Sequence, residues 1–242
     1  MFVLKRIFAA SLLAASFFSY AGAIKFGFNQ QHYSPHVIRD DNFTAQSGIV
    51  LDVSKTVAEE AGFIAKLVPL PRKRIEGFLV EGKIDVQCHT NPAWYTNPNL
   101  IWSVPLYVDS DVVVSTRKLP SLDAFHESKD FKLGTVLGYK YPEIAPYFAA
   151  GNIKRFNSTS SKGSFARFVK GELDGFVSSF SEANYLVQLK RFNVLAINYN
   201  QIHCTFSPKL NEEKRNRLLK ATEQLKEKGE FERILAKYIK PD

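Results

Sequence analysis

Residues 70–88 read LPRKRIEGFLVEGKIDVQC, and this stretch changes from a helical pattern to a strand pattern. Ile75, Phe78 and Leu79 recur at the spacing of one helix face, and Gly82 follows where a left-handed cap is needed. The last five residues alternate apolar and polar side chains, which is the two-residue period of a strand. A helix that leads directly into a strand predicts an α/β fold.

The residues that follow this strand are the first candidates for a functional site. In an open α/β sheet, ligands bind beyond the carboxyl ends of the strands. His89 and Thr90 stand at that position, so we expect them to face a ligand.

Two further segments extend the pattern along the chain. A loop after the strand leads to WSVPLY at residues 102–107, and a second helix-to-strand joint reads VKGELDGFV at residues 169–177. In order and spacing these segments resemble the extracellular solute-binding proteins of family 3, the amino-acid-type periplasmic binding proteins of ABC importers. The resemblance implies a two-lobed, periplasmic-binding-protein-like α/β fold of type II, in which each lobe is a mainly parallel sheet flanked by helices. It also implies that residues 24–112 and 201–242 form the first lobe, that residues 113–200 form the second, and that two hinge crossings join them.

The N-terminus has the features of an export signal. Lys5 and Arg6 precede an apolar run at residues 7–18, and AGA at residues 21–23 forms a small-residue cleavage site. The run is short for a membrane span. We therefore predict that residues 1–23 are a cleaved signal peptide and that the mature protein is periplasmic; a retained membrane anchor is the alternative.

The charge of the chain argues against one class of partner. The whole chain carries a net charge of +8. Without Lys5 and Arg6, 30 basic residues remain against 24 acidic residues, so the mature chain carries +6. The basic residues are spread along the sequence and form no dense block of the kind that binds nucleic acid. We expect a monomer that binds a small molecule and no nucleic acid, and the sequence indicates no cofactor.

The chain contains two cysteines, Cys88 and Cys204. In an oxidising compartment a pair of cysteines is usually bridged. Both alternate with apolar neighbours as strand residues do, Cys204 with Ile202 and Phe206. We predict that the two cysteines form a disulfide; two buried free thiols are the alternative.

The resemblance assigns ligand contacts in the first lobe. Tyr33 and His36 lie in a loop where the family has an aromatic-proline segment that touches the ligand; alternatively, Pro35 only shapes a turn. Amino-acid binders of the family also carry, before the segment that WSVPLY matches, an arginine that grips the ligand's α-carboxylate. Residues 89–102 include no arginine or lysine, and Trp94 stands in that neighbourhood. An indole donates one hydrogen bond and cannot replace a bidentate guanidinium.

A basic run, Arg72, Lys73 and Arg74, begins the helix of the opening stretch. Positive charges at a helix N-terminus oppose the helix dipole, which favours a separate reason for their presence. By resemblance to relatives with a proline before this helix, we select Arg74 as a ligand contact. The sequence leaves open which of the three residues faces the ligand, and a solvated charge run is the alternative.

The resemblance also implies contacts in the second lobe. A tyrosine follows the strand predicted over residues 131–137, and a run of hydroxyls begins a later helix, where it can seat an anion or simply cap the helix. Where amino-acid binders place an aspartate for the ligand's ammonium group, this chain has a serine, and a glutamate is the nearest acid. These candidates are Tyr139, Ser158, Thr159, Ser160, Ser179 and Glu182.

Binding without catalysis is the function that these patterns favour. The missing arginine and aspartate predict a small polar solute other than a simple α-amino acid. Closure of two lobes buries such a solute, and the permease subunits of an ABC importer recognise the closed form. A sensory or partner-binding protein without a transporter and a dehydratase-like enzyme on the same fold are the alternatives.

The candidate reactive groups give little support to an enzyme. Cys88 and His89 are adjacent on a predicted strand and point to opposite faces, so they cannot form a nucleophile and base pair. His89 and His203 could supply two ligands of a metal site, which is weak evidence without a third. We therefore assign no catalytic residue and no metal ligand.

Overall fold

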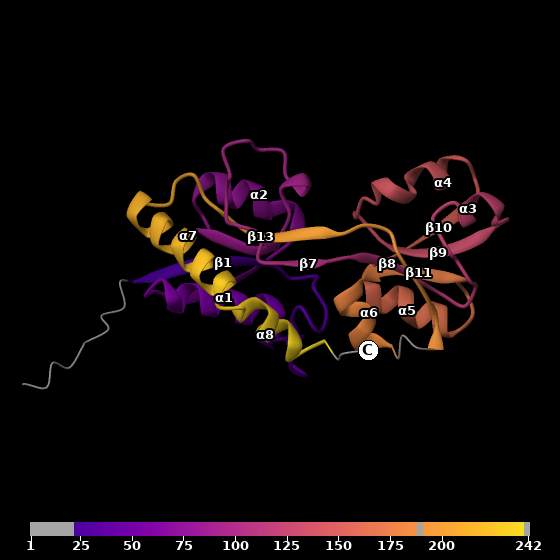
Figure 1. Cartoon of the computed structure of the whole chain (residues 1–242), viewed down its shortest axis with the longest axis horizontal. Helices are drawn as coiled ribbons and strands as arrows, with labels where there is room; N and C mark the ends of the chain where they lie inside the picture. Colours follow the sequence, from indigo (N-terminus) through magenta and orange to yellow (C-terminus); the bar gives the residue numbers. More distant parts are fainter. Residues whose placement is uncertain (1–21, 188–190, 240–242) are drawn as a thin grey trace, which may run out of the picture.

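The computed structural model describes residues 22–187 and 191–239. These residues form two lobes that lie side by side along the long axis of the molecule (Figure 1). The predicted signal peptide falls almost entirely on residues 1–21, which lie outside the described residues. Within the described part of the chain, no helix combines the length and the apolar character that a membrane crossing requires.

The first lobe is built on a sheet of six strands: β1 (Ala23–Asn29), β4 (Ile64–Leu70), β5 (Val86–Thr90), β6 (Ile101–Trp102), β7 (Tyr107–Asp109) and β13 (Asn200–Phe206). Their order is β4-β1-β5-β13-β6, and β7 also pairs with β13. β1 runs parallel to β4 and β5, whereas β13 runs antiparallel to its neighbours. The parallel strands are those that alternate with helices along the chain, as the α/β pattern predicts.

Helices cover both faces of this sheet: α1 (Ile49–Glu60), α2 (Arg72–Glu81), α7 (Glu212–Glu227) and α8 (Glu230–Ala236). α1, α7 and α8 share one face, where Val53, Leu218 and Phe231 join Phe26 and Val86 in one buried core. α2 covers the opposite face (Figure 1). A 3-10 turn η1 (Pro92–Trp94) and a small antiparallel pair, β2 (Ile38–Arg39) and β3 (Ala45–Ser47), complete the lobe.

The opening stretch forms a helix followed by a strand, as predicted. Ile75 and Leu79 of α2 are fully buried, and Gly82 caps the helix with a left-handed φ of 73°. All five residues of β5 are buried because helices cover both faces of the sheet. The polar residues of the predicted alternation are therefore paired inside the protein, and Gln87 accepts a hydrogen bond from the Tyr95 hydroxyl.

The second lobe is built on a sheet of five strands: β8 (Asp111–Ser115), β9 (Phe131–Val136), β10 (Ile153–Ser158), β11 (Gly175–Ser179) and β12 (Asn193–Ala196). Their order is β10-β9-β11-β8-β12. β9 runs parallel to β10 and β11, and β8 runs antiparallel to β11 and β12. The two sheets thus share one plan, three parallel strands followed by antiparallel strands that include a crossing strand.

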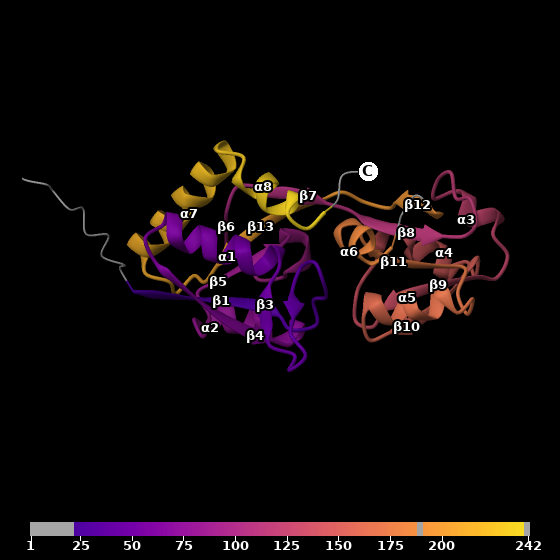
Figure 2. The same cartoon turned by 90° about the horizontal axis from the view of Figure 1, so that it is seen from below.

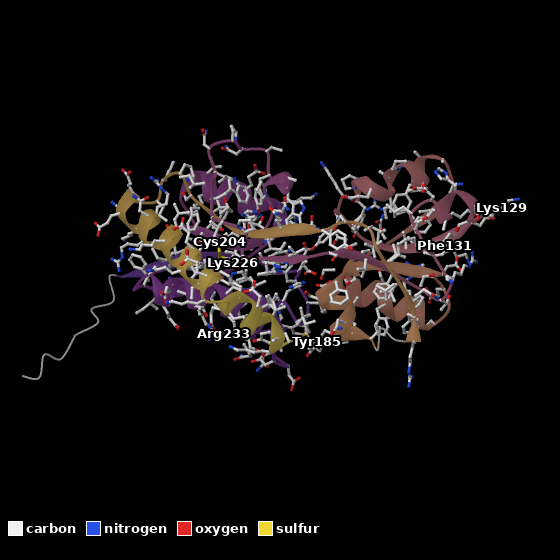
Figure 3. The ribbon with its side chains drawn as sticks, viewed as in Figure 1. Lys129, Phe131, Tyr185, Cys204, Lys226 and Arg233 are labelled. Carbon is white, nitrogen blue, oxygen red and sulfur yellow. A yellow bond between two sulfur atoms is a disulfide. The ribbon has the colours of Figure 1, made fainter. Side chains whose placement is uncertain are left out.

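The helices of the second lobe are α3 (Ala124–Glu127), η2 (Pro142–Ile144), α4 (Ala145–Ala149), α5 (Ser161–Val169) and α6 (Phe180–Leu186). On one face of the sheet, Phe125 and Tyr147 pack with Phe131, which Figure 3 labels. On the other face, Phe168 packs on Phe176. Each lobe therefore has its own buried core.

The chain passes between the two sheets twice (Figure 2). β7 ends at Asp109 and β8 begins at Asp111, while β12 ends at Ala196 and β13 begins at Asn200. The two-lobed fold with two hinge crossings is therefore as predicted. The predicted lobe boundaries, at residues 112/113 and 200/201, lie next to these crossings. The exact boundaries stay a prediction.

A disulfide joins β5, which comes before the first crossing in the chain, to β13, the strand that follows the second crossing. Cys88 on β5 lies opposite Cys204 on β13, the two residues are bonded, and their Cα atoms are 3.9 Å apart. Both are buried in the core of the first lobe, where Figure 3 labels Cys204. The predicted bond is confirmed.

Candidate functional site

Polar side chains from both lobes meet where the lobes face one another. They come from the loop after β1, the end of β5, the first crossing and the start of α6. We call this set the inter-lobe polar cluster: His32, His36, His89, Tyr107, Asp109, Ser179 and Glu182. His32 and Ser179 are half-buried and the other members are buried.

A β-bulge places His89 in the cluster. The β5 residues on either side of His89 pair with consecutive residues of β13, His203 and Cys204, which leaves His89 as an extra residue in the ladder. Its φ is 61°, in the left-handed region that few residues other than glycine adopt. Because bulges redirect side chains, His89 can bring its Nδ1 atom to 2.8 Å from the Tyr107 hydroxyl.

His203 lies outside the cluster. Its Nδ1 atom is 2.9 Å from the Ser103 carbonyl oxygen, and its ring meets Trp102 edge-on. The imidazoles that surround His89 are instead those of His32 and His36.

Three imidazole rings stand in mutual contact. Ring centroids are 4.2 Å apart for His36 and His89, 5.2 Å for His32 and His89, and 5.6 Å for His32 and His36. Burial lowers the pKa of all three rings well below 6.5, and the other histidines and the Arg72 guanidinium lower the pKa of His32 and His89 further. The rings are therefore neutral at pH 7, and each keeps one nitrogen that can accept a hydrogen bond or bind a metal ion.

Asp109 stands at the end of β7, on the crossing itself. Its Oδ1 atom accepts hydrogen bonds from the backbone N–H groups of Ser110, at 3.0 Å, and Ser181, at 3.3 Å. Its Oδ2 atom lies 3.8 Å from His36 Nε2 and has no partner at hydrogen-bond distance. Burial raises the pKa of this carboxyl to about 7, although the nearby Ser181 hydroxyl acts in the opposite direction.

The second lobe contributes Ser179 and Glu182 at the start of α6. Ser179 Oγ accepts the Glu182 backbone N–H, at 3.2 Å, and lies 3.0 Å from His36 Nε2 across the gap between the lobes. The Glu182 carboxyl is hydrogen-bonded by the hydroxyls of Ser178 and Ser161 and by the Tyr33 backbone N–H of the first lobe. Burial raises the pKa of Glu182, and these hydrogen bonds partly offset that effect.

Arg72 forms a second meeting point of the lobes. Its guanidinium lies 5.4 Å from the ring centroid of Trp94 in the first lobe and 5.9 Å from that of Tyr139 in the second. Asn29, at the end of β1, donates a 3.4 Å hydrogen bond to the Tyr139 hydroxyl, and burial raises the pKa of Tyr139 to about 12. Arg74 is exposed, whereas Arg72 is half-buried. Of the two arginines, Arg72 is therefore the one that lies close to aromatic rings of both lobes.

The other predicted contacts have their own local roles. Ser160 caps α5 by accepting the Gly163 backbone N–H at 3.1 Å. Ser158 has a buried hydroxyl without a hydrogen-bond partner, and Thr159 is exposed. Thr90 is fully buried on β5. Among the described residues, no hydrogen bond joins these four side chains to the inter-lobe polar cluster.

Two cavities are lined by residues outside the cluster. One of about 510 Å³ is bounded by α2 and the loop after η1, with Lys73, Glu76 and Asn97 in its wall. The other, of about 290 Å³, lies on the second lobe and includes Tyr139 and Arg155. Tyr139 therefore lines the second cavity and also contacts Arg72.

The arrangement can bind polar groups, and Cys88 adds no thiol nucleophile to it. Cys88 is in a disulfide, so it supplies no thiolate for attack. The remaining groups are neutral imidazoles, hydroxyls, the carboxyls of Asp109 and Glu182, a guanidinium and aromatic faces. Such groups orient a polar or anionic small molecule by hydrogen bonds and by charge.

Sequence reasoning missed three members of the cluster and underrated Arg72. His32 is in the same loop as His36, and Tyr107 and Asp109 are two residues apart on a strand. A carboxylate at the end of that strand, just before the crossing, was the one signal that could have pointed to Asp109.

Three comparisons place the chain among known proteins. The sequence profile of the bacterial extracellular solute-binding proteins, family 3, matches residues 24–241. A search of curated proteins found no match.

The solved structures that are similar have a two-lobed binding-protein fold. An ancestral cationic amino-acid solute-binding protein is 21% identical, with 90% of this chain and 96% of that chain covered and a TM-score of 0.73. A second structure, described as an ancestral amino-acid-binding protein and a precursor of cyclohexadienyl dehydratase, is 21% identical over 90% and 96% of the two chains, with a TM-score of 0.72. The GluR0 ligand-binding core in complex with L-glutamate is 13% identical over 90% and 98%, with a TM-score of 0.69.

Proposed function

Because the chain belongs to the bacterial extracellular solute-binding proteins, family 3, we propose that it is a periplasmic protein that captures a small polar solute between its lobes. The solute-loaded form would then be presented to the membrane subunits of an ABC importer. The observation that carries this proposal is that both lobes supply one polar cluster, with His36 of the first lobe 3.0 Å from Ser179 of the second. A solute bound there would be held from both sides, which favours the closed form.

Arg72 suggests the chemical class of the solute. The guanidinium lies against two aromatic rings, Trp94 and Tyr139, one from each lobe. Within the described residues, no carboxylate lies within ion-pair distance of Arg72, so its charge is available to a ligand. An anionic group between the lobes would meet this cation and the neutral imidazoles beside it.

The two protein groups that typically bind an α-amino acid, an arginine and an aspartate, are absent from their expected positions in this chain. Residues 89–102 include no arginine or lysine. Ser179 stands at the expected aspartate, and the nearest acid, Glu182, is already hydrogen-bonded by Ser178, Ser161 and the Tyr33 backbone. The Glu182 carboxylate is therefore already engaged and is not free to pair with an ammonium group. We propose a small organic anion that lacks an α-ammonium group.

A thermal-shift screen of the mature protein tests this function. The panel contains organic acids, amines, α-amino acids and peptidoglycan fragments, all in EDTA. A ligand at 100 times its Kd stabilises the folded state by about 2.7 kcal/mol, which raises Tm by roughly 5–10 °C for a chain of this size. We expect such a shift from organic anions. No shift from any class would contradict solute binding, and a largest shift from α-amino acids would contradict the proposed class.

One observation favours a second candidate function. A similar structure is described as that of a precursor of cyclohexadienyl dehydratase, so the fold has an enzymatic branch. Incubation of the protein with its ligand, followed by proton NMR, separates the two functions. We expect the ligand to remain unchanged; its loss, with appearance of a product, would support the enzyme.

A further inference from the structure

A buried group of metal-type donors lies at the centre of the inter-lobe polar cluster. His36, His89 and Asp109 each offer one donor atom, and these three atoms all lie within 4.8 Å of one another. All three residues are buried. They come from three separate segments: the loop after β1, the bulge of β5 and the first crossing. Within the described residues, no other group of histidine, cysteine, aspartate or glutamate side chains meets this condition.

Two polar atoms of this group are buried without a hydrogen-bond partner, whereas His36 Nε2 lies 3.0 Å from Ser179 Oγ. Asp109 Oδ1 is held by two backbone N–H groups, while Oδ2 is buried without a hydrogen-bond partner. His36 Nδ1 is also buried without a partner. Buried polar atoms are almost always satisfied, so two such atoms in one cluster indicate a missing ligand.

His89 is oriented as metal-binding histidines usually are. Its Nδ1 atom is 2.8 Å from the Tyr107 hydroxyl, which leaves Nε2 as the nitrogen available to a ligand. Ligand histidines are typically fixed in this way through their second ring nitrogen. The left-handed backbone of His89, with a φ of 61°, maintains a placement that a regular strand would not give.

We propose that His36, His89 and Asp109 bind one divalent transition-metal ion of the zinc class. Two imidazole nitrogens and one carboxylate oxygen suit Zn²⁺, Co²⁺ or Ni²⁺, whereas Ca²⁺ and Mg²⁺ prefer oxygen ligands alone. This site is additional to the solute function and depends only on the geometry of the three side chains.

The geometry requires only a small adjustment. Zinc binds nitrogen and carboxylate oxygen at about 2.0–2.2 Å, so donor atoms in a tetrahedral site are about 3.3–3.6 Å apart. Contraction from the observed limit of 4.8 Å needs shifts of about 1 Å, which rotation of side chains can supply. His32, whose Nδ1 is buried and unpartnered, stands 5.2 Å from the His89 ring and is the fourth ligand that the site offers.

Calorimetric titration of the metal-free, untagged mature protein with ZnCl₂ tests the site. We expect one ion per chain. His36→Ala and His89→Ala are each expected to weaken binding at least 100-fold, because removal of even a supporting residue costs 10–100-fold. His126→Ala and His203→Ala are the matched controls, since His126 is exposed and His203 is directed to Ser103, and both should bind zinc as the wild type does.

A further variant and a second metal ion distinguish loss of the metal site from misfolding of a variant. Asp109→Asn keeps an oxygen for the two backbone N–H groups, and circular dichroism checks its fold. In the wild type, Co²⁺ should give the intense visible absorption of a four-coordinate site, which Asp109→Asn should reduce. No zinc binding, or binding unchanged in His36→Ala and His89→Ala, would overturn the proposal. Because the solute screen is run in EDTA, failure here is distinct from failure of the proposed function.

Discussion

Reduction of the disulfide between Cys88 and Cys204 gives the sharpest test of what joins the two chain segments of the first lobe. The bond links residues 116 positions apart, and the loop it closes contains the whole second sheet. In the chain-entropy treatment a loop of about 100 residues is worth about 4.7 kcal/mol, and the dependence on length is logarithmic, so this one is worth about 4.8 kcal/mol. We expect the free energy of unfolding to fall by about 2–5 kcal/mol when the bond is broken.

Guanidinium unfolding, followed by circular dichroism with and without reductant, measures this loss. The wild-type side chains stay in place on reduction, so the comparison isolates the cross-link. A Cys88→Ala, Cys204→Ala double variant is the control and should respond to reductant by less than about 0.5 kcal/mol. A loss below about 1 kcal/mol in the wild type, or two reactive thiols in the denatured and unreduced protein, would refute the reasoning.

Two further predictions concern the inter-lobe polar cluster. Lowering the pH from 7.5 to 5.5 in EDTA should reduce the free energy of unfolding by about 2 kcal/mol, because the unfolded chain protonates His32, His36 and His89 below pH 6.5 while the folded chain keeps them neutral. Each histidine lowers the free energy of unfolding by about 1.4 kcal/mol over this range. Asp109, with a pKa raised from 3.8 to about 7, takes up a proton in the folded state, which offsets about 2 kcal/mol of this loss. Urea unfolding at the two pH values measures the balance, and higher stability at pH 5.5 would be inconsistent with neutral histidines. Arg72→Ala should weaken binding of the organic anion by about 1.5–3 kcal/mol in calorimetry. Arg74→Ala removes the same charge from an exposed position on the same helix and should change the affinity less than about twofold. Equal effects of the two variants would show that Arg72 does not contact the anion.

The local pattern of the sequence was enough to predict an α/β fold, and the resemblance to the family 3 solute-binding proteins supplied its two-lobed arrangement. The change of period between Ile75 and Cys88 is set by burial of one helix face and by the pleat of a strand, and both are short-range effects. The disulfide followed from strand placement and compartment. The same reasoning could not identify which helices bury the two faces of β5, because some of those helices are distant in sequence.

The site depended more on long-range geometry. His36, His89, Ser179 and Glu182 were identified beforehand, yet the bulge that turns His89 toward the histidine pair arises from pairing with β13, more than 100 residues away. Asp109 was missed for a related reason. Which of the neighbouring arginines of α2 faces the second lobe depends on how the helix is rotated about its axis. The periodicity of the sequence does not determine that rotation relative to the second lobe.

Hydrogen–deuterium exchange with and without the solute identified in the screen tests capture between the lobes most directly. We predict that the ligand slows amide exchange in three segments together: residues 29–37 and 88–95 of the first lobe and residues 178–183 of the second. Protection confined to one lobe, or absent from these three segments while the ligand is bound, would contradict a site shared by both lobes.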